Sequence, residues 1–351
     1  MRITPMKILW GIFAIALIAA SSLTLKPDAV PEVATLTLRT PITQVIALRG
    51  WMMLGFFGGA IFFAIIGAVR RTMLGRGRIA FFLSAALAVV GVLHGVTIYS
   101  RGISNPGSLS ADPGITTSSS GNGAITVLQY NTHGGLVEAT SIADLVEEEG
   151  IDVLTLPETS TVSGVEIVDE LANRGLTFQM FDTGTAGTDA DYDSTVLLVS
   201  SAMGEYVEAD VDTGDAVYRS IVRAVPADGS GSDLIAIHSV APSTLSTKQW
   251  RIEIESAYNL CGAYPNAIYS GDFNSTVDHE LALGLSTTCT DAVAQAGSAG
   301  LGTWPSNLPS WLGSPIDRVM APTGYEGTEA AIVDLGGSDH RGVVVRLTPE
   351  S

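Results

Sequence analysis

Three apolar runs occupy the first third of the chain, and they constrain its fold more than any other feature. They extend from Ile8 to Leu25, from Val45 to Val69 and from Ile79 to Tyr99. The last two are long enough to cross a bilayer, because about 20 apolar residues in a helix span its hydrocarbon core. The first is shorter and follows basic residues, so a cleaved signal peptide is the alternative to the uncleaved anchor that we favour. We therefore predict an all-α membrane region at residues 1–101, with about three transmembrane helices near 8–25, 45–69 and 79–99.

The net charge of the chain changes sign near residue 100, where the apolar region ends. Residues 1–100 carry nine Lys and Arg against two Asp and Glu, a net charge of +7, whereas residues 101–351 carry nine against 34, a net charge of −25. Four arginines lie in the loop from Arg70 to Arg78, between the second and third runs. Arginine-rich loops stay in the cytoplasm. The sequence thus predicts a multi-pass protein of the cell membrane, with everything after Tyr99 on the extracytoplasmic side.

The rest of the chain has the composition of a linker and a folded domain. Residues 102–123 are rich in Ser, Gly, Pro, Asn and Thr without apolar periodicity, which predicts a flexible linker. Short β-like runs alternate with helical stretches over residues 124–351, a pattern typical of a mixed α/β fold with helices covering the sheets. The expected strands are 125–130, 152–156, 195–200, 217–225, 234–238, 267–269, 318–320 and 342–347, and the expected helices are 141–149 and 245–260.

Polar residues stand at the ends of these strands, where loops present functional groups from a rigid frame. They are Asn131, Glu158, His238, Asp272, Asn274, Asp339 and His340. Their oxygen donors suit Mg²⁺, with Mn²⁺ or Ca²⁺ as alternatives, rather than zinc. His238 and His340 are suited to proton transfer near neutral pH, and Asp317 is a candidate to orient His340. A hard cation, two histidines and an amide donor are the groups that phosphoester hydrolysis requires.

Other residue types give weaker or negative signals. The sequence has no Gly-x-Ser-x-Gly elbow and no Walker-type phosphate loop. Their absence from the sequence disfavours acyl transfer and functions driven by nucleotide hydrolysis. His94 lies inside the third apolar run and receives no catalytic role, whereas His133 and His279 stay ambiguous. The two cysteines, Cys261 and Cys289, form either a disulfide or two buried thiols.

Taken in order, these segments resemble the endonuclease/exonuclease/phosphatase superfamily over roughly residues 124–347. The resemblance implies a two-sheet β-sandwich flanked by helices. It also implies roles for individual positions: Asn131, Glu158 and Asp339 at the metal, His238 at the phosphate and leaving group, Asp272 and Asn274 positioning water and phosphate, and Asp317 paired with the general base His340. Tyr218 and Arg219 stand where the family often carries an aromatic or basic phosphate contact, which is a weaker match.

The chain also departs from the family pattern. Arg318 follows Asp317, where the family commonly has histidine. The carboxylate that supports the middle histidine in the deoxyribonuclease branch has three candidates, Asp189, Asp191 and Asp193. Trp304 lies in a segment similar to one of many bacterial members, and we expect it to be a packed loop residue.

The sequence as a whole predicts a membrane-anchored, extracytoplasmic, metal-dependent phosphoesterase that cleaves a phosphodiester. Its substrate would be a nucleic acid, a phospholipid or a sugar phosphate, and its other partner the lipid bilayer; no protein partner is predicted. One alternative is a nuclease acting on extracellular DNA or RNA. The charge of −25 and the single lysine of the outer part, Lys248, argue mildly against tight nucleic-acid binding. The other alternative is a catalytically inactive, membrane-tethered binding module.

Overall fold

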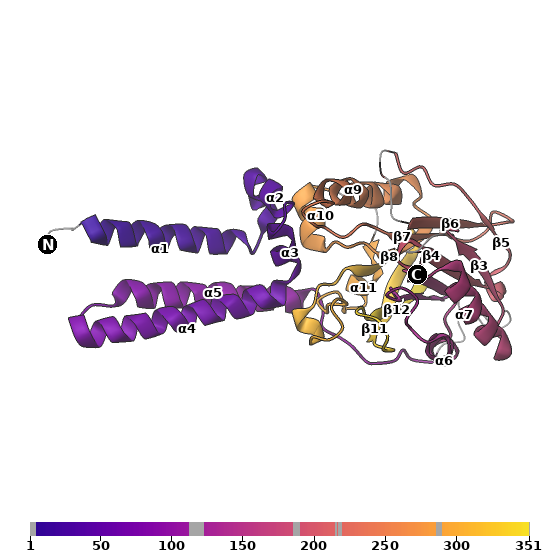
Figure 1. Cartoon of the computed structure of the whole chain (residues 1–351), viewed down its shortest axis with the longest axis horizontal. Helices are drawn as coiled ribbons and strands as arrows, with labels where there is room; N and C mark the ends of the chain where they lie inside the picture. The colour runs from indigo at the N-terminus through magenta and orange to yellow at the C-terminus, as the bar shows by residue number, and fades with distance from the viewer. Residues whose placement is uncertain are drawn as a thin grey trace.

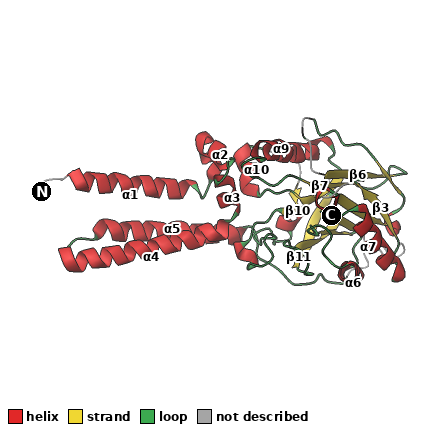
Figure 2. Cartoon of the chain, in the orientation of Figure 1, coloured by secondary structure: helices red, strands yellow, loops and turns green. Residues whose placement is uncertain are grey.

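Two mixed β-sheets of six strands each form the centre of the C-terminal part (Figures 1 and 2). The strand orders are β11-β12-β1-β2-β4-β3 and β5-β6-β7-β8-β10-β9. Only β1 with β2 and β7 with β8 pair in parallel among these neighbours. The strands are β1 (Ile125–Gln129), β2 (Val153–Pro157), β3 (Phe178–Asp182), β4 (Thr195–Ser200), β5 (Tyr206–Glu208), β6 (Ser220–Pro226), β7 (Asp233–His238), β8 (Ala267–Asp272), β9 (Thr290–Asp291), β10 (Asp317–Ala321), β11 (Tyr325–Val333) and β12 (Gly342–Pro349).

The helices lie outside the sheets and in a separate N-terminal bundle. The computed structural model describes residues 5–111, 123–184, 190–214, 216, 220–285 and 290–350. The α-helices are α1 (Pro5–Leu23), α2 (Pro31–Thr37), α3 (Ile42–Ala47), α4 (Arg49–Leu74), α5 (Arg78–Ser100), α6 (Ala139–Glu149), α7 (Thr161–Asn173), α8 (Ala190–Asp193), α9 (Thr247–Ala263), α10 (Val277–Leu283) and α11 (Ala292–Gln295), and the 3₁₀ turns are η1 (Pro27–Ala29), η2 (Ser201–Met203) and η3 (Ser310–Leu312).

The core is divided into three layers by the alternation of side chains along each strand. On β1, Val127 packs between the two sheets, while Leu128 faces α6 and α7 on the outer side. On β7, Ala236 packs between the sheets, while Ile237 faces α9. Successive side chains of a strand point to opposite faces, so sheets covered on both sides are apolar on both sides. The resulting helix, sheet, sheet, helix order confirms the predicted sandwich.

Two helices are long and apolar enough to cross a membrane, judged by length and composition alone. They are α4 and α5, which lie side by side (Figure 1). The apolar stretch of α1, Ile8–Leu23, is shorter than these two. Only two of the three expected spans therefore meet this criterion over the described residues, and they match the predicted runs 45–69 and 79–99.

A buried ionic cluster joins the N-terminal helices to the sheet domain. Arg49, at the start of α4, and Arg101, just after α5, both bind the carboxylate of Asp278 in α10. Arg49 also lies 3.1 Å from Nδ1 of His94, whose Nε2 lies 3.0 Å from Oγ1 of Thr24. His94 is fully buried, and its ring lies between Arg49 and Thr24 within this cluster.

The start of the predicted linker is attached to the domain. Ser104 N donates to Gly297 O at 2.9 Å, and the side chain of Asn105 exchanges hydrogen bonds with the backbone of Ile332. Leu109 N donates to Glu149 at 2.9 Å. Residues 102–111 therefore run along the domain instead of forming the flexible coil that composition predicted, because their backbone groups find partners on its surface. Residues 112–122 lie outside the described part.

Candidate active site

The predicted site residues lie at one edge of the paired sheets because the two parallel strand pairs end there. β1 leads into Asn131, β2 into Glu158, and β7 and β8 end at His238 and Asp272. The carboxyl ends of parallel neighbours meet at the same edge, as in other open α/β sheets. His340 precedes β12, which pairs antiparallel with β1, so its N-terminal end lies there too.

Strand register places Asp272 between two other site residues. Asp272 pairs with His238 across the parallel β7–β8 ladder and with Asp317 across the antiparallel β8–β10 ladder. Gly271 allows this close approach, because a Cβ there would lie 1.8 Å from the carbonyl oxygen of Ile237 and its φ is +154°. The glycine of the Ser-Gly-Asp-Phe-Asn segment is thus required by the neighbouring strand.

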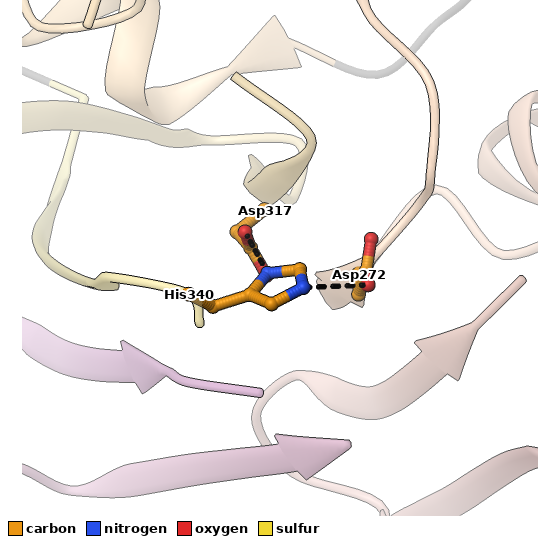
Figure 3. Close-up of side chains that lie close together, drawn as sticks. All are labelled: Asp272, Asp317 and His340. Atoms are coloured by element: carbon orange, nitrogen blue, oxygen red, sulfur yellow. Dashed lines mark hydrogen bonds and ion pairs between the residues drawn. The ribbon is translucent and has the colours of Figure 1, made fainter. Parts of the chain in front are cut away.

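His340 and Asp317 form a buried hydrogen-bonded pair (Figure 3). His340 Nδ1 lies 2.8 Å from Asp317 Oδ2, and His340 Nε2 lies 3.8 Å from Asp272 Oδ2. Gln129 Nε2 donates to the other oxygen of Asp317 at 3.0 Å. Asp317 therefore has both oxygens engaged, which fixes the orientation of the His340 ring.

The electrostatics of this cluster favour a proton on His340 and on Asp272. Burial alone would lower the pKa of His340, but the carboxylates of Asp317, Asp272 and Asp339 outweigh it and raise the pKa to about 10. Burial raises the pKa of the Asp272 carboxyl, and repulsion from Asp317 adds to the shift. The protonation of His340 and that of Asp272 therefore depend on each other.

A second group of carboxylates surrounds His133. Its Nδ1 lies 3.0 Å from Asp339 Oδ1 and 4.0 Å from Glu158 Oε2. Asn131 Nδ2 donates to Glu158 at 3.1 Å and to Asp272 at 3.2 Å. Burial raises the pKa of Glu158, and the Asn131 amide and the nearby His340 and His133 offset this effect only in part. This set of oxygens fits a hard divalent cation, which would supply the missing positive charge.

A different set of three ligand atoms is also compact enough for a metal. One atom each of Asp272, Asp317 and His340 lie within 4.8 Å of one another. The 2.8 Å bond between His340 and Asp317 already occupies one atom of each. This hydrogen bond suits the group to proton transfer, and the carboxylates of Glu158 and Asp339 around His133 offer a separate set of oxygens for a cation.

His238 and Asn274 complete the polar edge. His238 Nε2 lies 3.7 Å from Glu158 Oε1, and its side chain is buried. Asn274 Nδ2 donates to Asp272 at 3.2 Å and to Ser239 O at 2.9 Å. Asn274 has a φ of +48°, a left-handed conformation that asparagine tolerates, and this turns its side chain back toward Asp272.

These residues line a cavity of about 400 Å³. Its catalytic side is formed by His133, Glu158, His238, Asp272, Asn274, Asp339 and His340. The structure thus brings together all eight residues predicted for catalysis or metal binding, with Asn131 and Asp317 in hydrogen-bond contact behind this surface.

Three contacts were not predicted. Gln129, two residues before Asn131, donates a hydrogen bond to Asp317, and His133, left ambiguous, lies 3.0 Å from Asp339. Trp304 is not simply packed in its loop, because its Nε1 donates to Asp339 Oδ2 at 2.9 Å and its side chain is partly exposed. The Trp304 contact had a signal, since indole N–H groups seek an acceptor, but the acceptor lies 35 residues away.

Several predicted residues are not part of this site as described. Tyr218, Arg219, Asp189 and Cys289 lie outside the described residues, so the phosphate contact and the disulfide stay predictions. Asp191 accepts hydrogen bonds from Ser160 N at 3.3 Å and Ser163 Oγ at 3.2 Å, at the start of α7. Arg318 points to the opposite face of β10 from Asp317 and pairs with Asp291 at 2.9 Å. The residue that replaces the family's histidine therefore has a structural partner of its own.

Comparison with known proteins identifies the class. The sequence model of the endonuclease/exonuclease/phosphatase family matches residues 128–340. The chain belongs to this family, whose members are metal-dependent phosphoesterases and nucleases. No curated protein sequence matches the chain.

Solved structures of low sequence identity are similar in part. A humanized D. rerio TDP2 is 15% identical, with a TM-score of 0.49, over 64% of this chain and 99% of the other. A protein of the same family from Beutenbergia cavernae is 17% identical, with a TM-score of 0.47, over 65% and 72%. One from Bacteroides thetaiotaomicron is 14% identical, with a TM-score of 0.48, over 65% and 98%.

Proposed function

We propose that the chain is a membrane-anchored, extracytoplasmic phosphodiesterase that depends on a divalent metal. The observation that carries this proposal is the placement of the His340–Asp317 pair and the Glu158–Asp339 carboxylates around one cavity. Proton-transfer groups and hard cation ligands in one cavity are the requirements of metal-assisted phosphoester hydrolysis.

The contacts of the site residues suggest a different role for each. Glu158 and Asp339 would hold Mg²⁺, with Mn²⁺ or Ca²⁺ as substitutes, and Asn131 orients Glu158 through its amide. The cation, when bound, would neutralise charge on the phosphate. Asp272 and Asn274 face the same cavity and would position the attacking water and the phosphate.

The two histidines serve different steps. Asp317 holds His340 with Nε2 directed to Asp272, so His340 is placed to accept the proton of a water held at Asp272. His238 Nε2 lies beside Glu158, on the cation side of the cavity. From there it would contact the phosphate and donate a proton to the leaving oxygen.

A turnover assay on the full chain in phospholipid nanodiscs tests this function. With Mg²⁺, the wild type should hydrolyse at least one of plasmid DNA, RNA, phosphatidylcholine, sphingomyelin or bis(p-nitrophenyl) phosphate. His340→Ala should lose the activity, and Glu326→Ala, an exposed change on β11, should retain it. Absence of metal-dependent turnover on every substrate would favour the inactive binding module, and unchanged activity in His340→Ala would refute the role of that residue.

The membrane location is supported by the length and composition of α4 and α5 and by the arginines of residues 70–78. We infer that α4 and α5 span the cell membrane with their Arg49 and Ser100 ends outside. A reporter fused after Ser351 that fluoresces only in the cytoplasm should therefore stay dark. A bright fusion would place the catalytic domain in the cytoplasm and contradict the topology.

A nuclease remains the second candidate because the family includes nucleases. The net charge of −25 over residues 101–351 disfavours extended contact with a polyanion. The DNA and RNA arms of the assay separate the two candidates directly.

A further inference from the structure

One wall of the catalytic cavity comes from the N-terminal region and not from the sheet domain. Gln44 and Ala47 of α3, with Leu48 after it, line the same cavity as His238 and His340. These three residues lie far outside residues 128–340, the part that the family model matches. The wall is therefore an addition of this chain to the catalytic fold of the family.

Hydrogen bonds hold this wall against two loops of the site. Gln44 Nε2 donates to Pro242 O at 2.7 Å, in the loop that follows His238. The Nε2 of His279 lies 3.0 Å from Thr43 O, and its Nδ1 accepts from Thr276 N at 3.1 Å. Because Nδ1 is an acceptor, Nε2 carries the proton and donates to Thr43. The position of α3 is therefore set by the loops after β7 and β8.

The residues that hold the wall also hold the loop that carries Asn274. The rings of His279 and Trp250 meet edge to face at 5.1 Å between centroids. Trp250 Nε1 donates to Asn274 O at 2.9 Å. The helix α4, which continues from the wall, is fastened by Arg49 to Asp278, next to His279. Wall and catalytic residues thus share one buried scaffold.

The chemistry of the wall differs from that of the opposite side. Ala47 and Leu48 present apolar side chains, and Pro242 and Ile316 extend this apolar lining. The amide of Gln44 is fixed by its bond to Pro242, and its Oε1 is buried without a hydrogen-bond partner among the described residues.

We propose that Gln44, Ala47 and Leu48 bind the part of the phosphodiester that does not leave, and select a bulky apolar substituent there. The inference rests on the proposed function, since it concerns the substrate of the same site. A pocket that offers apolar surface on one side and charged groups on the other orients an amphiphilic ligand. The wall therefore sets specificity, and the catalytic residues set reactivity.

Two diesters with the same leaving group test this proposal on the full chain in nanodiscs. They are bis(p-nitrophenyl) phosphate and methyl p-nitrophenyl phosphate, which differ only in the remaining substituent. Ala47→Trp should raise KM for the aryl diester by about tenfold or more, a typical effect of altered pocket fit, and change the methyl diester by less than about twofold. Leu48→Ala, which removes apolar contact without adding bulk, should also raise KM selectively for the aryl diester. Val45→Trp, at an exposed position of α3 outside the cavity, is the control.

The outcomes separate the wall from the proposed function. Unchanged KM in both variants, or equal changes for both diesters, would overturn the wall's role while leaving phosphodiesterase activity in place. If the wild type turns over neither diester, calorimetric binding of bis(p-nitrophenyl) phosphate with Mg²⁺ decides instead. Binding that Ala47→Trp weakens and Val45→Trp preserves would support the wall, while the turnover assay on all five substrates decides catalysis. No binding to the wild type would overturn the role of the wall.

Discussion

His340 Nδ1 lies 2.8 Å from Asp317 Oδ2, although 23 residues separate them. Asp317 begins β10 in one sheet, and His340 precedes β12 in the other. The pair therefore links the two sheets at the edge where the cavity opens. The second oxygen of Asp317 is held by Gln129 from the sheet of β12, at 3.0 Å. A carboxylate held from both sides can keep an imidazole in one orientation, which is the structural requirement for directed proton transfer.

Asp317→Asn should slow turnover and shift its pH profile. The carboxylates raise the pKa of His340 to about 10 against the opposing effect of burial, and Asp317 is the largest of these contributions. A base with a raised pKa becomes active only as pH rises toward that value. Removal of the Asp317 charge lowers the pKa, so the rising limb of kcat/KM should move to lower pH by about one unit or more. The rate at its plateau should fall roughly 10²-fold to 10⁴-fold.

The pH profile at fixed Mg²⁺ is the measurement. Asp334→Asn, a change to an exposed acid, should leave the profile in place. If the rising limb of kcat/KM in Asp317→Asn stays at the wild-type pH, a group other than His340 titrates there.

Gln129→Leu should affect kcat more than KM. The variant removes the donor to Asp317 Oδ1, and Gln129 itself does not line the cavity. The carboxylate loses one hydrogen bond and part of its fixed orientation, so we expect a loss of about tenfold in kcat. Gln129→Glu, which is of similar size but lacks the amide donor, should have a kcat no higher than that of Gln129→Leu. An unchanged kcat in both would show that Asp317 needs no second support.

Metal dependence should reside in Glu158 and Asp339. Glu158→Gln and Asp339→Asn keep side-chain size but remove ligand charge, and should raise the Mg²⁺ concentration for half-maximal activity by about 10-fold to 100-fold. A chelator should abolish wild-type turnover, and added Mg²⁺ should restore it. Calorimetric titration of Mg²⁺ gives a second readout without catalysis. Equal metal affinity in the wild type and both variants would place the cation elsewhere.

The cluster at Asp278 should be the main electrostatic contribution to stability. The side chains of Arg49 and Asp278 are 5% and 2% exposed, and removal of one partner from such a buried pair costs about 3–5 kcal/mol. Asp278→Ala should therefore lower Tm strongly. Asp144→Ala breaks a pair with Arg174 in which the acid is 71% exposed, and should cost less than about 1 kcal/mol. Thermal unfolding of both variants in nanodiscs is the measurement, and equal Tm losses would contradict the role of burial.

The same cluster predicts a dependence on acid. Burial pushes the pKa of Asp278 up, but the guanidinium groups of Arg101 and Arg49 outweigh it and hold the pKa well below its usual range. Since the folded pKa is depressed, the stabilisation is fully present above the unfolded value of about 4 and is lost as pH falls toward the folded value. The Tm difference between the wild type and Asp278→Asn should shrink between about pH 5 and pH 3. A constant difference would show that Asp278 does not titrate with unfolding.

Much of the sandwich could be predicted from local signals. β1, β4, β7 and β12 are apolar runs that are buried on both faces, and their positions agree with the predicted strands to within two residues. β3 and β11 were missed because polar residues interrupt them. In β11, Glu326 and Gly327 fall within the strand, and Glu329 is accommodated by pairing with Arg346. Such a partner is visible only after the strands are paired.

By itself, the sequence determined the order of the site residues, their places at strand ends and the separation of an apolar region from an acidic domain, because these depend on neighbouring residues. Only the tertiary structure decided which distant groups meet. Gln129 contacts Asp317 across 188 positions, and Arg49 contacts Asp278 across 229. Such contacts follow from sheet pairing and helix packing, and the local periodicity of the sequence does not predict either of them. For the same reason, α3 was recognised as a wall of the cavity only when it was seen against the loops after β7 and β8.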